Sequence, residues 1–215
     1  MKDIPMFTTE YGVASLMLKE IPYRGQAYIR VRTVQTGQVP ELIAECVSFC
    51  RMVGAVTVCA AGHDDLELWP VYTTVLEMRG EARVDWEKVE NIFPVTEQTV
   101  SRWREIYNER MRGVDNAATL DARDENRILE SGGAYFVHRQ GELLGIGWLE
   151  DGKLLAVAST VPGMGERVMH TLMSLDEGGQ ITLEVASTNE RAIRLYERLG
   201  FVKTREINRW YRVLG

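Results

Sequence analysis

The sequence predicts an α/β protein with a mixed, mostly antiparallel sheet flanked by helices. Three observations indicate this class: apolar and β-branched runs at strand spacing, apolar stripes at helical spacing between them, and glycine-containing turns at many junctions. A chain of 215 residues with 45% hydrophobic side chains can bury a core without a disulfide or a metal. We expect a β-α-β-β unit over residues 1–90 and a larger unit over residues 91–215.

The N-terminal unit is predicted from alternation and helix signals. Residues 27–33 alternate inward and outward side chains, which is typical of a strand with one buried face. Pro40 suits a first helical turn, and apolar residues then repeat at helical spacing up to Gly54, which predicts a helix over 41–53. Residues up to Pro22 show no clear period and stay unassigned. Two further β-branched or aromatic runs are predicted strands, over 55–60 and 66–78.

The C-terminal unit is expected to begin where charge density rises and the strand pattern lapses, between Gly80 and Pro94. Thr96 can cap a first helix that ends near Met111, and a second helix is expected over 120–130. Two tight-turn dipeptides, Gln-Gly and Asp-Gly, separate three short strands, which predicts an antiparallel meander. The order ααβββαβαββ is completed by strands and helices over 134–139, 143–149, 154–160, 166–175, 181–186, 189–199, 201–204 and 209–213.

The composition narrows the classes of partner. A formal charge of -6 argues against non-specific binding to nucleic acid or to an anionic membrane. The same charge suits an amine-bearing partner, although mild acidity is also common in soluble proteins. Neither a secretory leader nor a stretch of eighteen apolar residues is found, so a cytoplasmic location is expected. Cys46, Cys50 and Cys59 are predicted to be reduced and buried, and no metal site is predicted.

The segment from Ile181 to Phe201 carries the strongest functional signal. Periodicity alone describes a well-capped amphipathic helix between two strands, in which Ser187 and Glu190 form a capping box. The residue identities go further: Asn189, Ala192, Tyr196, Gly200 and Phe201 resemble the second signature of the Gcn5-related N-acetyltransferases (GNAT). The element order from Val95 to Val213 is similar to that family's fold, lacking only its first strand.

This resemblance implies direct transfer of an acetyl group from acetyl-coenzyme A to a primary amine, carried by a small molecule or a peptide. It implies a monomer or a homodimer with no metal and no covalent acyl-enzyme. In such enzymes the tyrosine of the second signature protonates the departing thiolate, and here that residue is Tyr196. A phenol suits this role because it stays protonated at neutral pH.

The general base is less strongly indicated. Glu184 lies in a Leu-Glu-Val segment where enzymes resembling the ribosomal-protein N-terminal acetyltransferases place a base. Two alternatives stay open: Glu184 is a solvent-facing strand residue, or it pairs with an arginine such as Arg191. Water or Glu150 would then serve as the base.

The first GNAT signature, which binds the pyrophosphate of coenzyme A at a glycine-rich helix start, is weaker here. The corresponding stretch runs from Leu154 to Leu175, with Thr160 where the family has Arg or Gln, and its loop is about two residues short. A backbone N–H between Leu155 and Ala158 would polarise the thioester carbonyl. The resemblance assigns cofactor contacts to Val157, Gly163, Met164, Gly165, Glu166, Arg167, Asn189 and Tyr196. A non-catalytic acyl-coenzyme A binding or regulatory protein with the same fold is the alternative function.

The N-terminal unit shows a faint internal similarity. Residues 49–57 and 195–203 both contain a helix end, a glycine and a strand start, which suggests that the N-terminal unit is a truncated copy of the same fold. On this alignment Cys50 occupies the position of Tyr196, so the copy is predicted to be non-catalytic and to cover a sheet edge or a wall of the acceptor cleft. Coincidence is the competing explanation, because helix-glycine-strand junctions are common.

Overall fold

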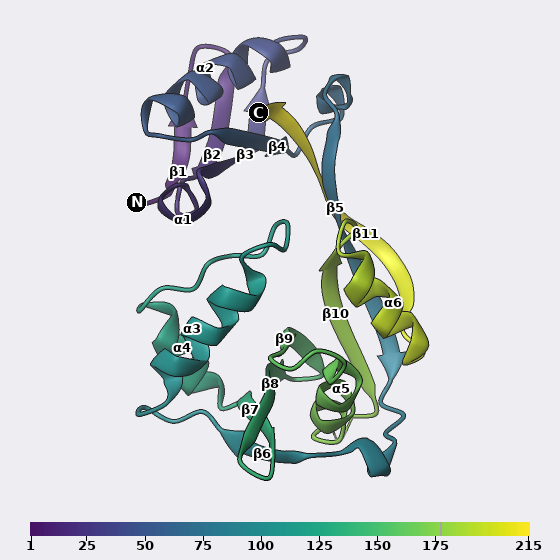
Figure 1. The fold of residues 1–215 in the computed structure, drawn as a ribbon. Coiled ribbons are helices and arrows are strands. Elements are labelled where there is room, and N and C mark those ends of the chain that lie inside the picture. The colour runs from purple at the N-terminus through teal and green to yellow at the C-terminus, as the bar shows by residue number, and fades with distance from the viewer. Residues whose placement is uncertain (177) are drawn as a thin grey trace. The chain divides into compact units, whose positions relative to one another are not determined.

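The chain forms two compact units in a computed structural model that describes residues 1–176 and 178–215 (Figure 1). Unit 1 combines residues 1–75 with 206–215, and unit 2 comprises residues 76–205. The division falls inside strands β5 and β11, whereas the sequence suggested a boundary near residue 90. The chain therefore enters unit 2 along one strand and leaves it along another.

Unit 1 is an antiparallel meander followed by a helical crossover to a parallel strand. β1, β2 and β3 pair antiparallel, β4 pairs parallel with β3, and the end of β11 pairs antiparallel with β4. Its elements in chain order are β1 (Ile4–Thr8), β2 (Gly12–Met17), α1 (Ile21–Arg24), β3 (Gln26–Val34), α2 (Val39–Met52), β4 (Thr57–Ala61), the 3₁₀ turn η1 (Asp64–Leu68), the start of β5 (Val71–Glu81) and the end of β11 (Val202–Leu214).

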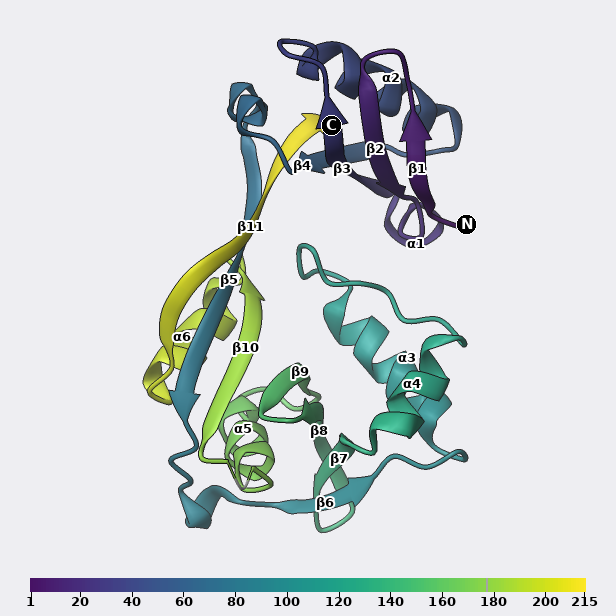
Figure 2. The same ribbon diagram turned by 180° about the vertical axis from the view of Figure 1, so that it is seen from behind.

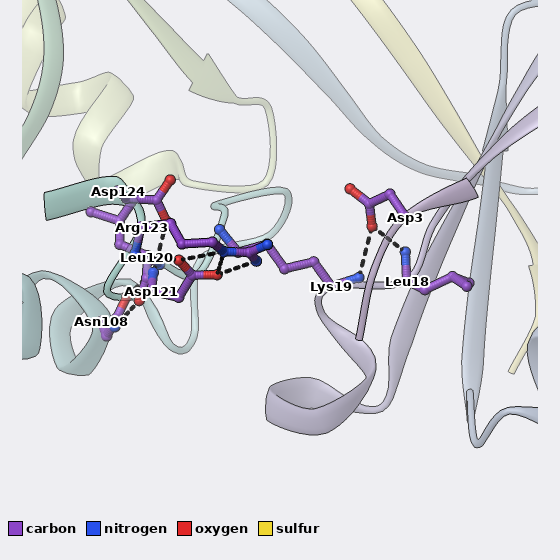
Figure 3. A network of polar contacts seen from close by, with 8 residues as sticks. All are labelled: Asp3, Leu18, Lys19, Asn108, Leu120, Asp121, Arg123 and Asp124. Carbon is purple, nitrogen blue, oxygen red and sulfur yellow. Dashed lines mark hydrogen bonds and ion pairs between the residues drawn. The ribbon is translucent and has the colours of Figure 1, made fainter. Parts of the chain in front are cut away.

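The core of unit 1 lies between α2 and the strands. Leu42, Ile43, Cys46 and Cys50 are buried on one face of α2 against β-strand residues such as Ile29, as the helical spacing predicted. All three cysteines are free and buried, which confirms that prediction. The unassigned N-terminal residues form the β1–β2 hairpin, whose exit is held by Asp3, an acceptor for the backbone N–H groups of Leu18 and Lys19 at 2.7 and 3.0 Å (Figure 3).

Unit 2 contains a second meander, a second crossover and four helices among the residues that the structure describes (Figure 2). β6, β7, β8 and β9 pair antiparallel, β10 pairs parallel with β9, and β5 lies between β10 and β11. Its elements are the rest of β5, the 3₁₀ turn η2 (Trp86–Lys88), β6 (Asn91–Pro94), α3 (Val100–Met111), α4 (Asp124–Ser131), β7 (Ala134–Arg139), β8 (Glu142–Glu150), β9 (Lys153–Ser159), α5 (Gly165–Met173), β10 (Gln180–Ala186), α6 (Glu190–Arg198) and the start of β11.

The predicted fold class is confirmed, and several boundaries are corrected. β6 supplies the first strand that the sequence pattern lacked, because its four residues are mostly exposed and show no alternation. The two strands expected at the C-terminus are one strand, β11. Residues 66–78, expected as one strand, divide into η1 and β5, with Pro70 at the junction, where a missing N–H costs no ladder hydrogen bond.

Two apolar clusters hold the helices of unit 2 against the strands. Val168, Met169 and Leu172 of α5 pack with Leu144 of β8 in one cluster, whereas Trp103 of α3 and Ile128 of α4 pack with Ile146 in the other. A side chain at Gly147 would collide with Leu172, so this glycine lets α5 lie close to β8. Asn108 bonds both the N–H and the C=O of Leu120, which fixes the connection between α3 and α4 (Figure 3).

Candidate active site

The parallel strands β9 and β10 separate soon after they meet. Their pairing covers Lys153 with Thr182 and Leu154 with Leu183, although β9 continues to Ser159 and β10 to Ala186. We call the space between the diverging strands the fork. Backbone N–H and C=O groups that face the fork have no partner in the β9–β10 ladder, so they are available to a ligand.

A β-bulge lies at the base of the fork. Trp148 and Leu149 are consecutive on β8 but pair with Ala156 and Leu154, which leaves Leu155 as the extra residue of β9. Bulges bend a strand and change the direction of its groups, and they are common beside active sites. The predicted carbonyl-polarising stretch, Leu155 to Ala158, therefore starts at the point where β9 turns away from β10.

The glycine-rich turn lies between β9 and α5, as the first signature predicted. Gly163 has a φ of +84°, which favours glycine, and a side chain there would meet no atom within 4 Å. Gly165, Glu166 and Arg167 form the first turn of α5, where backbone N–H groups have no helical carbonyl to bond. An anion beside Gly163 would face these donors and the positive end of the helix dipole.

Thr160 has a structural function in place of the Arg or Gln of the family signature. Its hydroxyl donates to the carbonyl of Leu143 at 2.5 Å, and its N–H donates to the carbonyl of Leu144 at 2.9 Å. Its own carbonyl accepts from Arg110 at 3.0 Å. The shortened loop is therefore anchored to β8 and α3 without a cationic side chain at this position.

Tyr196 lies on the buried face of α6. The residue is 7% exposed, and its ring packs on Phe201 with the ring centres 6.0 Å apart. Its hydroxyl has no hydrogen-bond partner among the described residues. The oxygen is not among the fully buried polar atoms that lack a partner, so it lies at the boundary of the apolar cluster. Burial raises the pKa of Tyr196 to about 12, which keeps the phenol protonated.

Asn189 caps α6, and the predicted capping box of Ser187 and Glu190 is wrong. The Asn189 carboxamide oxygen accepts from the N–H of Ala192 at 3.3 Å. The helix starts two residues later than the capping box requires, because a turn from Ala186 to Asn189 follows β10 first. The side-chain amino group of Asn189 remains as a donor at the end of β10.

Glu184 lies on β10 at the start of the fork and forms an ion pair with Lys153 of β9, with 2.6 Å between Oε1 and Nζ. Both side chains are close to half exposed. The expected alternative partner was an arginine such as Arg191, so the structure gives a different cation from a different strand. The exposed side chain of Glu184 is accessible to a substrate.

Glu166 and Arg167 direct their side chains to the segment between β5 and β6. Glu166 accepts from Lys88 at 2.7 Å, and Arg167 pairs with Glu90 at 2.7 Å. The Lys88 ammonium lowers the pKa of Glu166 from its ordinary value. The Arg167 guanidinium is thus already paired, so Glu166 and Arg167 offer an anion at the turn their backbone N–H groups.

The structure brings the glycine turn of α5 and Val157 of β9 together with the helix of Tyr196. A side chain at Gly165 would lie 3.3 Å from Leu195, which precedes Tyr196 on α6, so the glycine turn and the tyrosine helix are in contact. Val157 packs in the same cluster as Tyr196. Lys153, Lys88 and Glu90 were missed by the sequence reasoning, and only their charge in otherwise apolar or turn segments could have indicated them.

Two further observations concern the described part of the chain. No group of three or more His, Cys, Asp or Glu side chains there is arranged to hold a metal ion. In residues 1–176 and 178–215, no helix has the length and apolar character needed to cross a bilayer.

Sequence comparison finds one short similarity to a curated acetyltransferase. No family model matches the sequence. A segment of 53 residues is 38% identical to N-alpha-acetyltransferase RimI from Mycobacterium tuberculosis; it covers 25% of this chain and 34% of that relative. The match thus spans only about a third of the relative's length.

Solved structures resemble nearly the whole chain. A GCN5-related N-acetyltransferase from Sphaerobacter thermophilus has a TM-score of 0.57 at 14% identity, covering 94% of this chain and 77% of its own. A tandem GNAT protein from the clavulanic acid biosynthesis pathway has a TM-score of 0.51 at 15% identity, covering 94% and 78%. A GCN5-related N-acetyltransferase from Kribbella flavida has a TM-score of 0.56 at 10% identity, covering 95% of this chain and 58% of its own. The predicted resemblance is confirmed: the chain has the GNAT fold.

Proposed function

We propose that this chain, which has the GNAT fold, transfers the acetyl group of acetyl-coenzyme A to a primary amine of a small molecule or a peptide. One observation supports this activity beyond the fold itself: the fork between β9 and β10 opens beside the glycine turn of α5 and beside Tyr196. The RimI segment supports it, because that relative is an N-alpha-acetyltransferase.

The residues present fit such a donor. Gly165, Glu166 and Arg167 supply first-turn N–H groups for a pyrophosphate, with open space at Gly163. The N–H of Met164, also a predicted donor, already donates to the carbonyl of Val161 at 3.2 Å. The unpaired strand edges of the fork supply backbone donors and acceptors for the amide groups of the pantetheine arm. This arrangement would direct the thioester toward the bulge at Leu155 and the side chain of Tyr196.

The proposed reaction is a direct transfer. The amine nitrogen forms a bond to the thioester carbonyl carbon, a backbone N–H between Leu155 and Ala158 stabilises the developing oxyanion, and the carbon–sulfur bond breaks. Tyr196 gives its proton to the leaving thiolate, whose conjugate thiol has a pKa of about 8.5. The proton lost by the amine goes to Glu184 or to water, and Tyr196 regains a proton from solvent, so an amide and a free thiol are formed and the enzyme returns to its starting state.

Glu184 is the proposed base, with Lys153 beside it. Asn189 is proposed to orient the donor or a bound water through the NH2 group of its carboxamide, whose oxygen caps α6. An amine of the lysine type has a pKa of about 10.4 and an α-amine about 7.7 to 8.0, so a base matters more for lysine. The exposed position of Glu184 favours access by a free amine from solvent.

Unit 1 is proposed to be non-catalytic. Its β3 and β4 pair over all five residues of β4, from Gln26 with Thr57 to Arg30 with Ala61, so no fork opens between them. Without a fork, this crossover offers no unpaired strand edges to a pantetheine arm. The proposal also keeps the cytoplasmic location and the monomeric or homodimeric state that the sequence suggested, which fractionation and light scattering would test.

A non-catalytic acyl-coenzyme A sensor is the second candidate. It is favoured by one observation: the guanidinium of Arg167, the cation nearest the turn in sequence, is paired with Glu90, so its charge is already engaged before a pyrophosphate binds. A sensor would need only modest affinity and no acceptor chemistry.

Calorimetry with acetyl-coenzyme A, followed by a thiol-release screen over small amines and peptide N-termini, tests the proposal. Micromolar binding with thiol release that depends on an amine is expected. Binding without release for any amine would favour the sensor, and the absence of binding would reject both.

A further inference from the structure

The segment between β5 and β6 is tied to helix α5 by polar contacts that the proposed chemistry does not use. We call residues 82–90 the β5–β6 segment. The N–H of Asp85 donates to Nδ1 of His170 at 3.2 Å, and the N–H of Glu90 donates to the hydroxyl of Thr171 at 2.9 Å. The side chain of Lys88 pairs with Glu166. These contacts run along α5 from its first turn to its middle.

Glu90 is the centre of this network. Its side chain is 7% exposed, and it accepts from Nε of Arg139 at 3.0 Å and from a second nitrogen of the same guanidinium. It also accepts from Arg167 at 2.7 Å, and Arg167 donates further to the carbonyl of Glu87 at 3.3 Å. The two guanidinium groups, that of Arg139 above all, hold the pKa of Glu90 below its ordinary value.

The position of Arg167 gives this network a consequence for ligand binding. Arg167 is the third residue of α5, so its backbone N–H is one of the first-turn donors that have no helical carbonyl to bond, and Gly163, where a side chain would meet no atom within 4 Å, lies four residues before it. An ion pair with a nearly buried carboxylate fixes the residue before any ligand arrives. Donors that are already aimed at an anion need no reorganisation when it binds.

We propose that Glu90 is a positioning residue for the donor site: through Arg167 it fixes the first turn of α5, so that the pyrophosphate is held by backbone N–H groups while the guanidinium stays outside the site. The inference rests on the proposed function, because it assigns the anion to acetyl-coenzyme A. Glu90 itself touches no reacting atom.

Glu90→Gln is the first variant, with Glu87→Gln as its matched control, since Glu87 is on the same segment and its side chain is exposed. Loss of the carboxylate is expected to raise the Kd and the KM for acetyl-coenzyme A about tenfold with kcat within about twofold, which corresponds to about 1.4 kcal/mol. The control should leave both constants unchanged. An equal effect of both variants, or an unchanged KM in folded Glu90→Gln, would overturn the proposal.

Arg167→Gln tests the same contact from its other end and leaves the pair of Glu90 with Arg139 in place. We expect it to raise the KM by a similar factor, and the double variant to add less than about twofold, because both changes break one contact. If Arg167 instead held the pyrophosphate directly, Glu90→Gln would free the cation and tighten binding while Arg167→Gln weakened it. These opposite signs would refute the positioning role.

Hydrogen exchange without ligand separates the failure of this inference from the failure of the proposed function. Amides in a peptide covering residues 161–170 should exchange faster in Glu90→Gln than in the wild type or in Glu87→Gln. Faster exchange in a protein that does not bind acetyl-coenzyme A would reject the donor and leave Glu90 as the residue that fixes this turn. Unchanged exchange together with normal binding would reject Glu90 alone.

Discussion

Replacing Tyr196 by Phe separates catalysis from stability in an unusually direct way. The phenol oxygen has no hydrogen-bond partner among the described residues, and the ring contact with Phe201 does not involve it. Removing the oxygen therefore breaks no hydrogen bond to the described residues, and the free energy of unfolding should change by less than about 0.5 kcal/mol. For a chain of this size such a change moves the melting temperature by less than about 2 °C.

The effect on turnover should be far larger. A positioned general acid contributes about 10²–10⁴ to a rate, so kcat should fall about 100-fold or more, with the Kd for acetyl-coenzyme A within about twofold. Because burial raises the pKa of Tyr196 to about 12, the wild-type acid stays protonated throughout an ordinary assay, and the deficit should be nearly constant from about pH 6 to about pH 9.

The assay is thiol release at saturating acetyl-coenzyme A, with thermal melts of the same samples. Tyr135→Phe is the control, since it removes the same atom from a half-buried tyrosine of β7. A folded Tyr196→Phe protein with wild-type kcat would refute the acid role and would leave the ring as a core residue. A large loss of stability would show that the oxygen has a contact that the structure lacks.

Three further predictions concern neighbouring features. Gly165→Ala should be tolerated, because its Cβ would lie 3.3 Å from one methyl group of Leu195 and alanine favours a helix over glycine by about 1 kcal/mol. Gly165→Val should raise the KM for acetyl-coenzyme A, because the larger side chain would crowd that contact. Calorimetry with acetyl-coenzyme A on both variants tests this difference. Glu184→Gln should lower kcat about 100-fold if Glu184 is the base, because it removes the proton acceptor while Lys153 stays beside the side chain, and an unchanged kcat would point to water. Hydrogen bonds from Arg205 and Thr204 lower the pKa of Glu77 from 4.5 to about 2, so this carboxylate stabilises the folded state above pH 4.5, and the stabilisation is lost as the pH falls toward 2. Over that pH range the melting temperature should fall less in Glu77→Gln than in the wild type. An identical dependence of the melting temperature on pH in both proteins would contradict the assignment.

The helix of the second signature was predictable because every local signal there agrees. The apolar stripe through Leu195 and Tyr196 and the Gly200 stop specify one helix, and the residue identities indicate the family that the chain resembles. The sequence indicates Asn189 as a site residue but Ser187 as the helix cap, since either residue can begin the helix at this spacing, and the structure gives the cap to Asn189.

The edge strands were not predictable by the same reasoning. β1 and β6 are short and exposed on much of both faces, so they lack the alternation that a half-buried strand shows. The sequence divides β11 at residues 205–208 because these are mostly exposed and partly charged, although the backbone continues through them as one strand. In each case backbone pairing, which leaves little trace in the sequence, determines the strand.

The charged part of the site was hidden for a related reason. Glu90 and Lys88 lie in a segment whose charge density suggested a boundary, and only the folded chain brings them to Glu166 and Arg167, more than seventy residues away. A sequence shows that a residue is charged, but whether it faces water or a second charge depends on contacts of this range. Site residues on α5 were therefore predicted, and the partners of their side chains were not.

The two crossovers of the chain show what distinguishes a ligand site from a closed sheet. β3 and β9 each end an antiparallel meander, and each is followed by a helix and a parallel strand, β4 or β10. Each also has a bulge, at Arg32 in β3 and at Leu155 in β9, as the pairing with β2 and β8 shows. This correspondence differs from the predicted one, which matched the first crossover to the helix of Tyr196.

The position of the bulge relative to the parallel partner accounts for the difference. In β3 it lies beyond Arg30, where β4 has already ended at Ala61, so bending there separates nothing. In β9 it directly follows the second paired residue, Leu154, while β10 still has residues up to Ala186 to come. A strand bent before its partner ends must leave that partner, and the unpaired groups then face an opening. The fork, and with it the proposed donor site, thus follows from where one extra residue falls along a strand.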